Sequence, residues 1–344
     1  MKFYKLIKKK SIKAIEGRIP KITSNEILTK VLYSGLCGSD LSVYLGSHPY
    51  KKPPVVLGHE FCGTIIKSKV KNILKKNDKN LVTTLPYDYC NKCTQCIKGE
   101  TNHCSNKTIP SFKTWNGTFA DYFVCKKNSI IKLDKHINPL DAVLIEPFAI
   151  CNHAINLVKK KKIYNTLVLG AGNTGLATLM LTKSNNKFNR IGCVDIYNSR
   201  KDIVKKLGAN YFVKYNKYQL QNKIFKFTKK KGVDVIFITC DYPNVINDAI
   251  KIINPKGIII ITSYFKNKFK IDYNEIVKKE ILIQGSFLSN KSDFFQVHRL
   301  IKKKLIFPRL IISHIYSMRK IKYAFNQMLN HRDKNIKIIL KNEK

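Results

Sequence analysis

The sequence has no apolar run long enough to cross a lipid bilayer, and its first ten residues are basic without the apolar stretch and cleavage site of a secretory leader. It also has no low-complexity, collagen-like or coiled-coil region. With 44% hydrophobic residues, disorder is excluded as well. These absences predict a globular protein with no membrane partner, and we expect a cytoplasmic one.

Arginine is scarce and acidic residues are few. Of 64 basic residues only seven are arginine, against 22 acidic residues, and the formal net charge is +42. Nucleic-acid sites favour the guanidinium fork of arginine, whereas here lysine is spread along the whole chain. We therefore interpret the charge as a uniformly solvated lysine surface, and we expect no specific nucleic-acid partner. Weak binding to polyanions at low salt follows from the charge in either case.

At 344 residues the chain is long enough for two domains. In the first 150 residues the pattern indicates short strands and turns, bounded by clusters of Gly, Pro and Asn. From residue 165 the pattern changes to strands and helices in alternation, with continuous apolar strands such as Ile258–Ile261. Such strands belong to a parallel sheet that is buried on both faces. The expected fold class is α/β, a doubly wound (Rossmann) domain beside a mainly β domain.

Further strands and helices are expected within these two regions. Expected strands are 27–33, 63–68, 80–84, 119–125, 166–169, 190–195, 233–239, 257–262, 281–287 and 336–340; expected helices are 176–183, 199–207, 244–253, 293–304 and 320–329.

Four of the ten cysteines fall in one short segment: Cys90, Cys93, Cys96 and Cys104. The two-residue spacers let neighbouring thiolates bind one ion, and Gly99 lets the chain bring in the fourth. Four thiolates without an open position suit a structural zinc ion. An iron-sulfur cluster uses similar ligands and stays open as an alternative. His103, beside the last thiol, is interpreted as a bystander.

A glycine-rich turn follows the apolar strand 166–169 and opens a helix. Its residues Gly170, Gly172, Asn173, Thr174 and Gly175 fit a turn that holds a pyrophosphate at a helix N-terminus. The alternative is a plain turn.

Asp195, 20 residues beyond this turn, is placed to accept hydrogen bonds from ribose hydroxyls and would repel a 2′-phosphate, so NAD is favoured over NADP. Arg200 weakens that preference. An unrelated surface aspartate is the alternative interpretation.

A second set of potential metal ligands is scattered over the amino-terminal half: Cys37, the pair His59 and Glu60, and Glu146. Each alone is unremarkable in a core or on a surface. Together they supply a thiolate, an imidazole and carboxylates from three turns, the mixed ligand set of an open, catalytic zinc site.

With these motifs the chain resembles the zinc-dependent medium-chain dehydrogenases/reductases, in their polyol (sorbitol-like) and threonine dehydrogenase branch. The resemblance is carried by segments 35–40, 58–60, 90–104, 145–147 and 170–175 and by Asp195. It implies a GroES-like catalytic domain over 1–150 with the zinc loop 90–104. It also implies an NAD-binding Rossmann domain over 151–287, a return to the catalytic domain over 288–344, and a homodimer or homotetramer.

The resemblance also implies site roles and cofactors, NAD and two Zn²⁺ per chain. Cys37 and His59 match catalytic zinc ligands, and Glu60 and Glu146 match further ligands of that ion. Ser39 matches the hydroxyl that relays the substrate proton, and Asp40 matches the carboxylate that orients the imidazole. The implied reaction is NAD-linked oxidation of a secondary alcohol, a small-molecule polyol, sugar, sugar phosphate or amino-cyclitol. L-threonine 3-dehydrogenase is the alternative enzyme, and a lapsed relative or a basic zinc-loop binding protein is the alternative of another class.

Several positions depart from the family pattern. Ser42 stands where many relatives have the outer histidine of the proton relay, and His48 is interpreted as a loop residue rather than its substitute. Cys240 and Asp241 replace a small residue and a glycine, and Ile315 follows His314 where many polyol dehydrogenases have arginine. Substrate recognition is therefore expected to differ from that of ordinary sorbitol dehydrogenase. Cys151 is a rival to Glu146 as a ligand.

Overall fold

The protein is described by a computed structural model that covers residues 1–70, 73, 80–112, 115–242, 244–265, 268 and 270–343. It divides into two compact units. Unit 1 comprises Met1–Ala149 and Asn290–Lys344, and unit 2 comprises Ile150–Ser289. The first boundary falls inside helix α4 (Ile145–Leu157). The chain thus leaves unit 1, completes unit 2 and returns.

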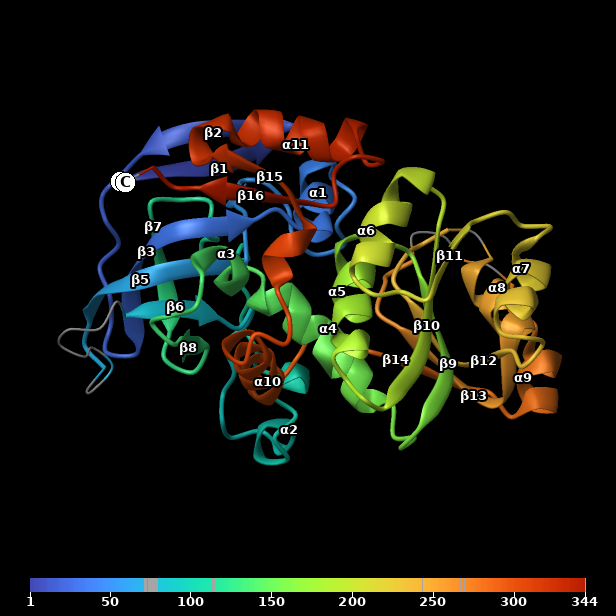
Figure 1. Ribbon diagram of the computed structural model, residues 1–344. Helices are drawn as coiled ribbons and strands as arrows, with labels where there is room; N and C mark the ends of the chain where they lie inside the picture. Colours follow the sequence, from blue (N-terminus) through green and yellow to red (C-terminus); the bar gives the residue numbers. More distant parts are fainter. Residues whose placement is uncertain are drawn as a thin grey trace. The chain divides into compact units, whose positions relative to one another are not determined.

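Unit 1 is built on sheets. Within the described residues, a seven-stranded sheet has the order β15-β16-β3-β5-β6-β8, with β7 paired to β3, and a three-stranded sheet has the order β2-β1-β4 (Figure 1). The strands are β1 (Lys2–Lys8), β2 (Ser11–Glu16), β3 (Glu26–Gly35), β4 (Val55–Val56), β5 (Glu60–Ser68), β6 (Leu81–Thr84), β7 (Tyr122–Lys126), β8 (Ile130–Lys132), β15 (Ile312–Ser317) and β16 (Lys337–Lys341).

The helices of unit 1 are short. They are α1 (Gly38–Tyr44), α2 (Thr94–Ile97), α3 (Pro139–Ala142), α10 (Lys291–Lys302) and α11 (Ile321–Asn330), with 3₁₀ turns η1 (Thr101–His103), η3 (Pro308–Ile311) and η4 (Met318–Lys320). The core beneath them is aromatic. Phe61 lies 5.3 Å from Phe123, measured between ring centroids, and Trp115 stacks on Phe123 at 6.0 Å. Aromatic side chains bury a large apolar area each, so this cluster holds the strands of unit 1 together.

Unit 2 is a parallel sheet with the strand order β11-β10-β9-β12-β13-β14 in the described chain. Figure 1 shows α5 and α6 on one face and α7, α8 and α9 on the other. The strands are β9 (Ile163–Leu169), β10 (Phe188–Asp195), β11 (Tyr211–Lys214), β12 (Val233–Ile238), β13 (Ile253–Ile261) and β14 (Leu282–Gly285). The helices are α5 (Asn173–Lys183), α6 (Lys201–Lys206), α7 (Leu220–Phe227), α8 (Val245–Ile252) and α9 (Tyr273–Lys279), with the turn η2 (Asn198–Arg200).

The order of the strands in unit 2 reverses beside β9. From β9 the chain builds outward through β10 and β11, and it then continues on the other side of β9 with β12. Crevices outside the carboxyl ends of parallel strands at such a reversal bind ligands. Gly170 and Asp195 stand at the carboxyl ends of β9 and β10. The predicted dinucleotide residues therefore lie at this edge of the sheet.

The expected fold class is confirmed, and most expected strands and helices are found within a few residues of their predicted bounds. One expected strand, 119–125, is shorter than predicted: β7 begins only at Tyr122, because Ala120 instead pairs with Phe3 of β1. The helix expected over 199–207 begins as the 3₁₀ turn η2. The elements that were not expected are strands β1, β2, β4, β8, β11 and β15 and helices α1 to α4, α7 and α9. No helix among the described residues has the length and apolarity to span a membrane.

Candidate functional site

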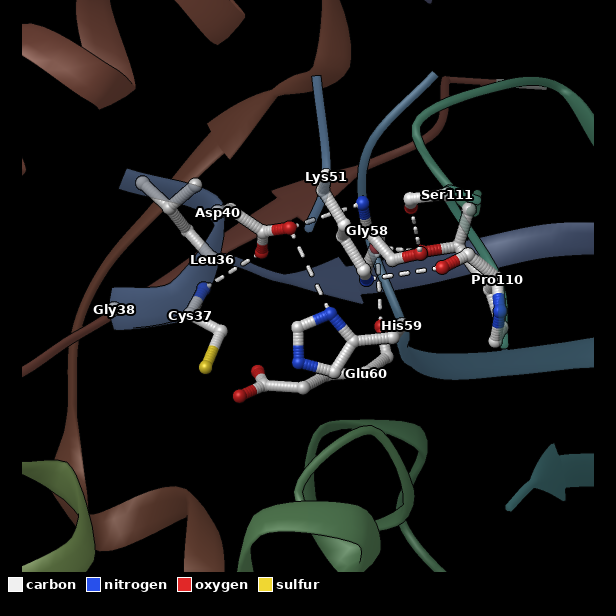
Figure 2. A network of polar contacts seen from close by, with 12 residues as sticks. Leu36, Cys37, Gly38, Asp40, Lys51, Gly58, His59, Glu60, Pro110 and Ser111 are labelled. Atoms are coloured by element: carbon white, nitrogen blue, oxygen red, sulfur yellow. Dashed lines mark hydrogen bonds and ion pairs between the residues drawn. The ribbon is translucent and has the colours of Figure 1, made fainter. Parts of the chain in front are cut away.

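Cys37, His59 and Glu60 come together where the neighbouring strands β3 and β5 of the seven-stranded sheet end and begin (Figure 2). Strands β3 and β5 are antiparallel, and Gly35 at the end of β3 is paired with Glu60 at the start of β5. Cys37 follows β3 as the N-cap of α1, so the turn after one strand meets the start of the other. One ligand atom from each residue lies within 4.8 Å of those of the other two. This spacing fits one shared metal ion.

Asp40 lies beside the histidine of this group. Its Oδ1 lies 3.6 Å from Nδ1 of His59, and the two carboxylate oxygens accept hydrogen bonds from the backbone N–H groups of Gly58 (3.2 Å) and Cys37 (3.1 Å). Burial opposes ionisation of Asp40, but the neighbouring His59 and these hydrogen bonds lower its pKa below the usual value. A carboxylate on one ring nitrogen leaves the other nitrogen available for a metal.

Glu60 forms a fully buried ion pair with Lys337 of β16. The side chains of both residues have no exposure to solvent, and the pair joins Oε2 of Glu60 to Nζ of Lys337. Lys337 also donates a hydrogen bond to the carbonyl oxygen of Leu36 (3.3 Å). Oε1 of Glu60 is buried and accepts no hydrogen bond among the described residues. An unsatisfied buried carboxylate oxygen beside a thiol and an imidazole fits the ligand set of zinc.

Sequence reasoning missed Lys337. A charged residue inside the apolar strand Ile336–Leu340 was the available signal, because a lysine in a buried strand needs a partner. The structure also shows why Gly35 carries no side chain. A Cβ atom there would lie 1.8 Å from Oε2 of Glu60, so the carboxylate occupies the space that any other residue would fill.

Glu146 lies in the first turn of α4 and is buried, with 4% exposure. It is not part of the group whose ligand atoms all lie within 4.8 Å. Burial raises the pKa of Glu146 to about 7, and Glu60 adds to this rise while His59 opposes it. Glu146 is therefore close enough to His59 and Glu60 for their charges to affect its pKa, but its carboxylate is not among the three ligand groups that lie within 4.8 Å of one another. Cys151 directs its thiol to the carbonyl oxygen of Thr174 (3.3 Å).

The residues considered for proton transfer differ in their surroundings. Ser39 is half-buried in the first turn of α1, between Cys37 and Asp40 in sequence. Ser42 donates its hydroxyl to the carbonyl oxygen of Gly38 (3.2 Å), four residues earlier in the same helix. The Nδ1 atom of His48 accepts hydrogen bonds from backbone N–H groups two and three residues later. The side chains of Ser42 and His48 thus form hydrogen bonds with nearby backbone groups of their own segment.

The four cysteines of segment 90–104 also converge. Their sulfur atoms lie within 4.8 Å of one another, with separations of 3.6 Å between Cys90 and Cys104 and 3.9 Å between Cys93 and Cys104. Four thiolates about 2.3 Å from one zinc ion stand about 3.8 Å apart, so the donor set fits. Backbone N–H groups of Cys96 and Ser105 lower the pKa of Cys93 to about 5, which favours the thiolate.

The glycine-rich turn has the geometry that its sequence predicts. Gly170 has φ of +105°, a conformation that favours glycine, and a Cβ atom on Gly175 would lie 1.8 Å from the carbonyl oxygen of Gly170. Gly172 is the N-cap of α5, and Asn173 and Thr174 form the first turn of this helix. Oδ1 of Asn173 is buried and accepts no hydrogen bond within the described chain. These N-terminal groups are arranged to hold an anion.

Asp195 connects three parts of this edge of the sheet. Its Oδ2 accepts hydrogen bonds from the backbone N–H of Ala171 (2.6 Å) and from Nη1 of Arg200 (3.1 Å), and its Oδ1 accepts one from the N–H of Tyr197 (2.8 Å). The carboxylate is therefore held against the turn. Arg200 also lies near the glycine-rich turn: a Cβ atom built on Gly172 would be 3.8 Å from Nη1 of Arg200.

Three residues that depart from the family pattern lie after β12 in the chain: Cys240, Asp241 and Ile315. Cys240 is half-buried and its thiol lies 3.1 Å from the carbonyl oxygen of Leu169 at the end of β9. Asp241 is exposed. Ile315, which follows His314 in β15, has 43% exposure.

Comparisons with known proteins show which family the chain matches. Residues 23–135 match the family described as "Alcohol dehydrogenase GroES-like domain", and residues 174–303 match "Zinc-binding dehydrogenase". D-arabitol-phosphate dehydrogenase of Enterococcus avium is 27% identical over 92% of this chain and 90% of that protein. L-threonine 3-dehydrogenase of Pyrococcus horikoshii is 28% identical over 91% of each.

A solved alcohol dehydrogenase of Escherichia coli CFT073 (rspB), in complex with NADH, is 25% identical, with a TM-score of 0.90 over 99% of each chain. The chain belongs to the zinc-type medium-chain dehydrogenases/reductases, as the resemblance of its motifs predicts, and it is an oxidoreductase. The predicted cofactors, zinc and a nicotinamide dinucleotide, agree with these findings.

Proposed function

We propose that the protein oxidises a secondary alcohol of a polyol, sugar, sugar phosphate or amino-cyclitol and transfers the hydride to NAD. The observation that carries this proposal is the convergence of Cys37, His59 and Glu60 within 4.8 Å, with one buried oxygen of Glu60 left without a hydrogen bond. Zinc bound there supplies a Lewis acid that lowers the pKa of the alcohol. NAD supplies the acceptor for the hydride.

Residues of unit 1 would hold the zinc ion and accept the substrate proton. Cys37, His59 and Glu60 would hold the catalytic zinc, with Glu146 as a further carboxylate ligand from α4. Asp40, whose Oδ1 lies 3.6 Å from Nδ1 of His59, would keep that imidazole in one orientation. Ser39 carries the hydroxyl that would take the substrate proton. Since Ser42 and His48 are engaged with their own backbone, the proton would leave Ser39 directly to water.

The residues of unit 2 would hold the dinucleotide. Gly170, Gly172, Asn173, Thr174 and Gly175 are assigned to the pyrophosphate and Asp195 to the adenosine ribose. The carboxylate of Asp195 would repel a 2′-phosphate, which favours NAD. Arg200 neutralises part of that charge, so the preference is expected to be incomplete.

The other assignments complete the proposal. Cys90, Cys93, Cys96 and Cys104 would hold a second, structural zinc ion. Free thiols in that number suit a reducing compartment, and we propose a cytoplasmic location. We also propose a homodimer or homotetramer, with residues 1–150 and 288–344 as the catalytic domain.

L-threonine 3-dehydrogenase is the second candidate function. It is favoured by the relative from Pyrococcus horikoshii, to which the identity is as high as to the polyol-phosphate relative. Threonine and a polyol both present a secondary alcohol to the metal, and they differ in the groups around it.

A substrate panel tests the proposal. The zinc-loaded enzyme is incubated with NAD and polyols, polyol phosphates, cyclitols or threonine, and NADH is followed by its absorbance while zinc per chain is measured. We expect two zinc ions and NADH formation with one substrate class, abolished in Cys37→Ala. Failure of every alcohol to reduce NAD in protein that holds two zinc ions would contradict the proposed reaction and leave a lapsed relative.

A further inference from the structure

Lys51 places an ammonium group beside the proposed metal ligands, and no described residue forms an ion pair with it. Its Nζ donates one hydrogen bond, to the carbonyl oxygen of Pro110 (2.9 Å). Among the described residues it makes no ion pair within 4.0 Å; the side chain is half-buried, and this burial lowers its pKa. In Figure 2 the side chain lies between Asp40 and Pro110. A half-buried ammonium group with one hydrogen bond and no ion pair among the described residues has donors left for an anion.

The loop that carries Lys51 is held in place. The ring of His48 accepts hydrogen bonds from the backbone N–H groups of Tyr50 (3.2 Å) and Lys51 (3.1 Å). The neighbours of Lys51 on both sides, Tyr50 and Lys52, are exposed, so the loop reaches solvent. A cation that is fixed before its ligand binds loses little side-chain entropy on binding.

The acidic groups nearest to Lys51 are engaged elsewhere. The charge of Asp40 is taken up by His59 and by two backbone N–H groups. Glu60 is paired with Lys337. Asp40, and more weakly the thiol of Cys37 and the carboxylate of Glu146, act on Lys51 through space without an ion-pair contact, and Cys37 belongs to the metal set. No described residue therefore forms an ion pair with Lys51 within 4.0 Å.

We propose that Lys51 binds an anionic group, phosphate or carboxylate, of the alcohol substrate. A lysine ammonium binds phosphate as a point charge and carboxylate in the same way, so the shared chemistry is a negative charge near the reacting alcohol. This inference rests on the proposed function and narrows its substrate to phosphorylated or acidic polyols. Lys51 is then a specificity-determining residue, since a neutral polyol leaves its ammonium group unpaired.

Matched substrates test this assignment in the zinc-loaded enzyme with NAD. For each polyol, kcat/KM is compared with that of its phosphate monoester and of its aldonic acid, in the wild type and in Lys51→Met, Lys51→Arg and Lys52→Met. We expect the wild type to favour one of the two anionic forms at least tenfold. Lys51→Met should lower this preference tenfold or more, mainly through KM, while Lys51→Arg retains part of it. Lys52→Met, the exposed neighbour, should keep the full preference.

A binding measurement separates failure of this inference from failure of the proposed function. Inorganic phosphate is titrated into the zinc-loaded protein without NAD, and its dissociation constant is measured by calorimetry for the same variants, whose folding is checked by circular dichroism. We expect weaker binding in Lys51→Met and wild-type binding in Lys52→Met, whether or not any alcohol is oxidised. Equal effects of Lys51→Met on neutral and anionic alcohols, with phosphate binding retained, would overturn the assignment and leave the proposed dehydrogenase intact.

Discussion

Glu60 and Lys337 form an ion pair in which neither side chain has any solvent exposure, and the pair joins the start of β5 to the last strand of the chain. The two residues are far apart in sequence, yet β16 and β5 both pair with β3. A proposed metal ligand is thus held by a cation supplied by the C-terminal segment. Removing one partner of such a pair costs more than removing both.

Lys337→Met should therefore destabilise the metal-free protein by about 3–5 kcal/mol, because it leaves the carboxylate of Glu60 buried without compensation. The double variant Lys337→Met/Glu60→Leu should be less destabilised than Lys337→Met alone. Urea unfolding followed by fluorescence measures both. A single variant as stable as the wild type, or a double variant less stable than the single one, would contradict this account of the pair.

Gly35→Ala should displace the carboxylate of Glu60, since the new Cβ would lie 1.8 Å from Oε2. We expect a destabilisation of about 1–3 kcal/mol and loss of one of two zinc ions per chain. Gly38→Ala is the matched control, because a Cβ at Gly38 meets no atom within 4 Å. Zinc is counted by elemental analysis. Retention of both ions in Gly35→Ala would show that the position of Glu60 does not govern the metal.

Two cysteine variants should separate the two metal sites. Cys93→Ala removes a thiol from the loop 90–104, and we expect one zinc ion to be lost and stability to fall by more than about 4 kcal/mol. Cys37→Ala should lose the other ion and at least about 10³-fold in kcat, with a smaller loss of stability. Thermal unfolding and kcat are measured on the same samples. Equal losses of stability and activity in both variants would refute separate structural and catalytic roles.

Asp195→Ser should change the choice of cofactor. The substitution removes the carboxylate that accepts the hydrogen bond from Arg200, so the guanidinium group becomes available to a 2′-phosphate. We expect the ratio of kcat/KM for NADP to that for NAD to rise about tenfold or more, which corresponds to about 1.4 kcal/mol. Asp202→Asn, an exposed aspartate on α6, serves as the control and should keep the wild-type ratio. An unchanged ratio in Asp195→Ser would remove this residue from cofactor selection.

Much of the fold could be predicted from local patterns of apolar residues in the sequence. The apolar run Ile258–Ile261 predicts a strand buried on both faces, and the structure places it inside the parallel sheet of unit 2. Strands β1 and β2 escaped prediction because their lysines mask the apolar alternation, as in KFYKLIK. The 3₁₀ turn before α6 was missed because short turns have no periodicity to detect.

The sequence by itself determined the ligand chemistry, the glycine turn and the class of fold, because each is written in residues that are neighbours or near neighbours along the chain. Cys90 to Cys104 and Gly170 to Gly175 are such sets. Only the tertiary structure decided that Glu60, and not Glu146, joins Cys37 and His59 in the closest set of ligand atoms, that Lys337 balances Glu60, and that Lys51 forms no ion pair with a described residue. These relationships depend on strand pairing and burial, which bring together side chains from distant segments and set the energy of each charge.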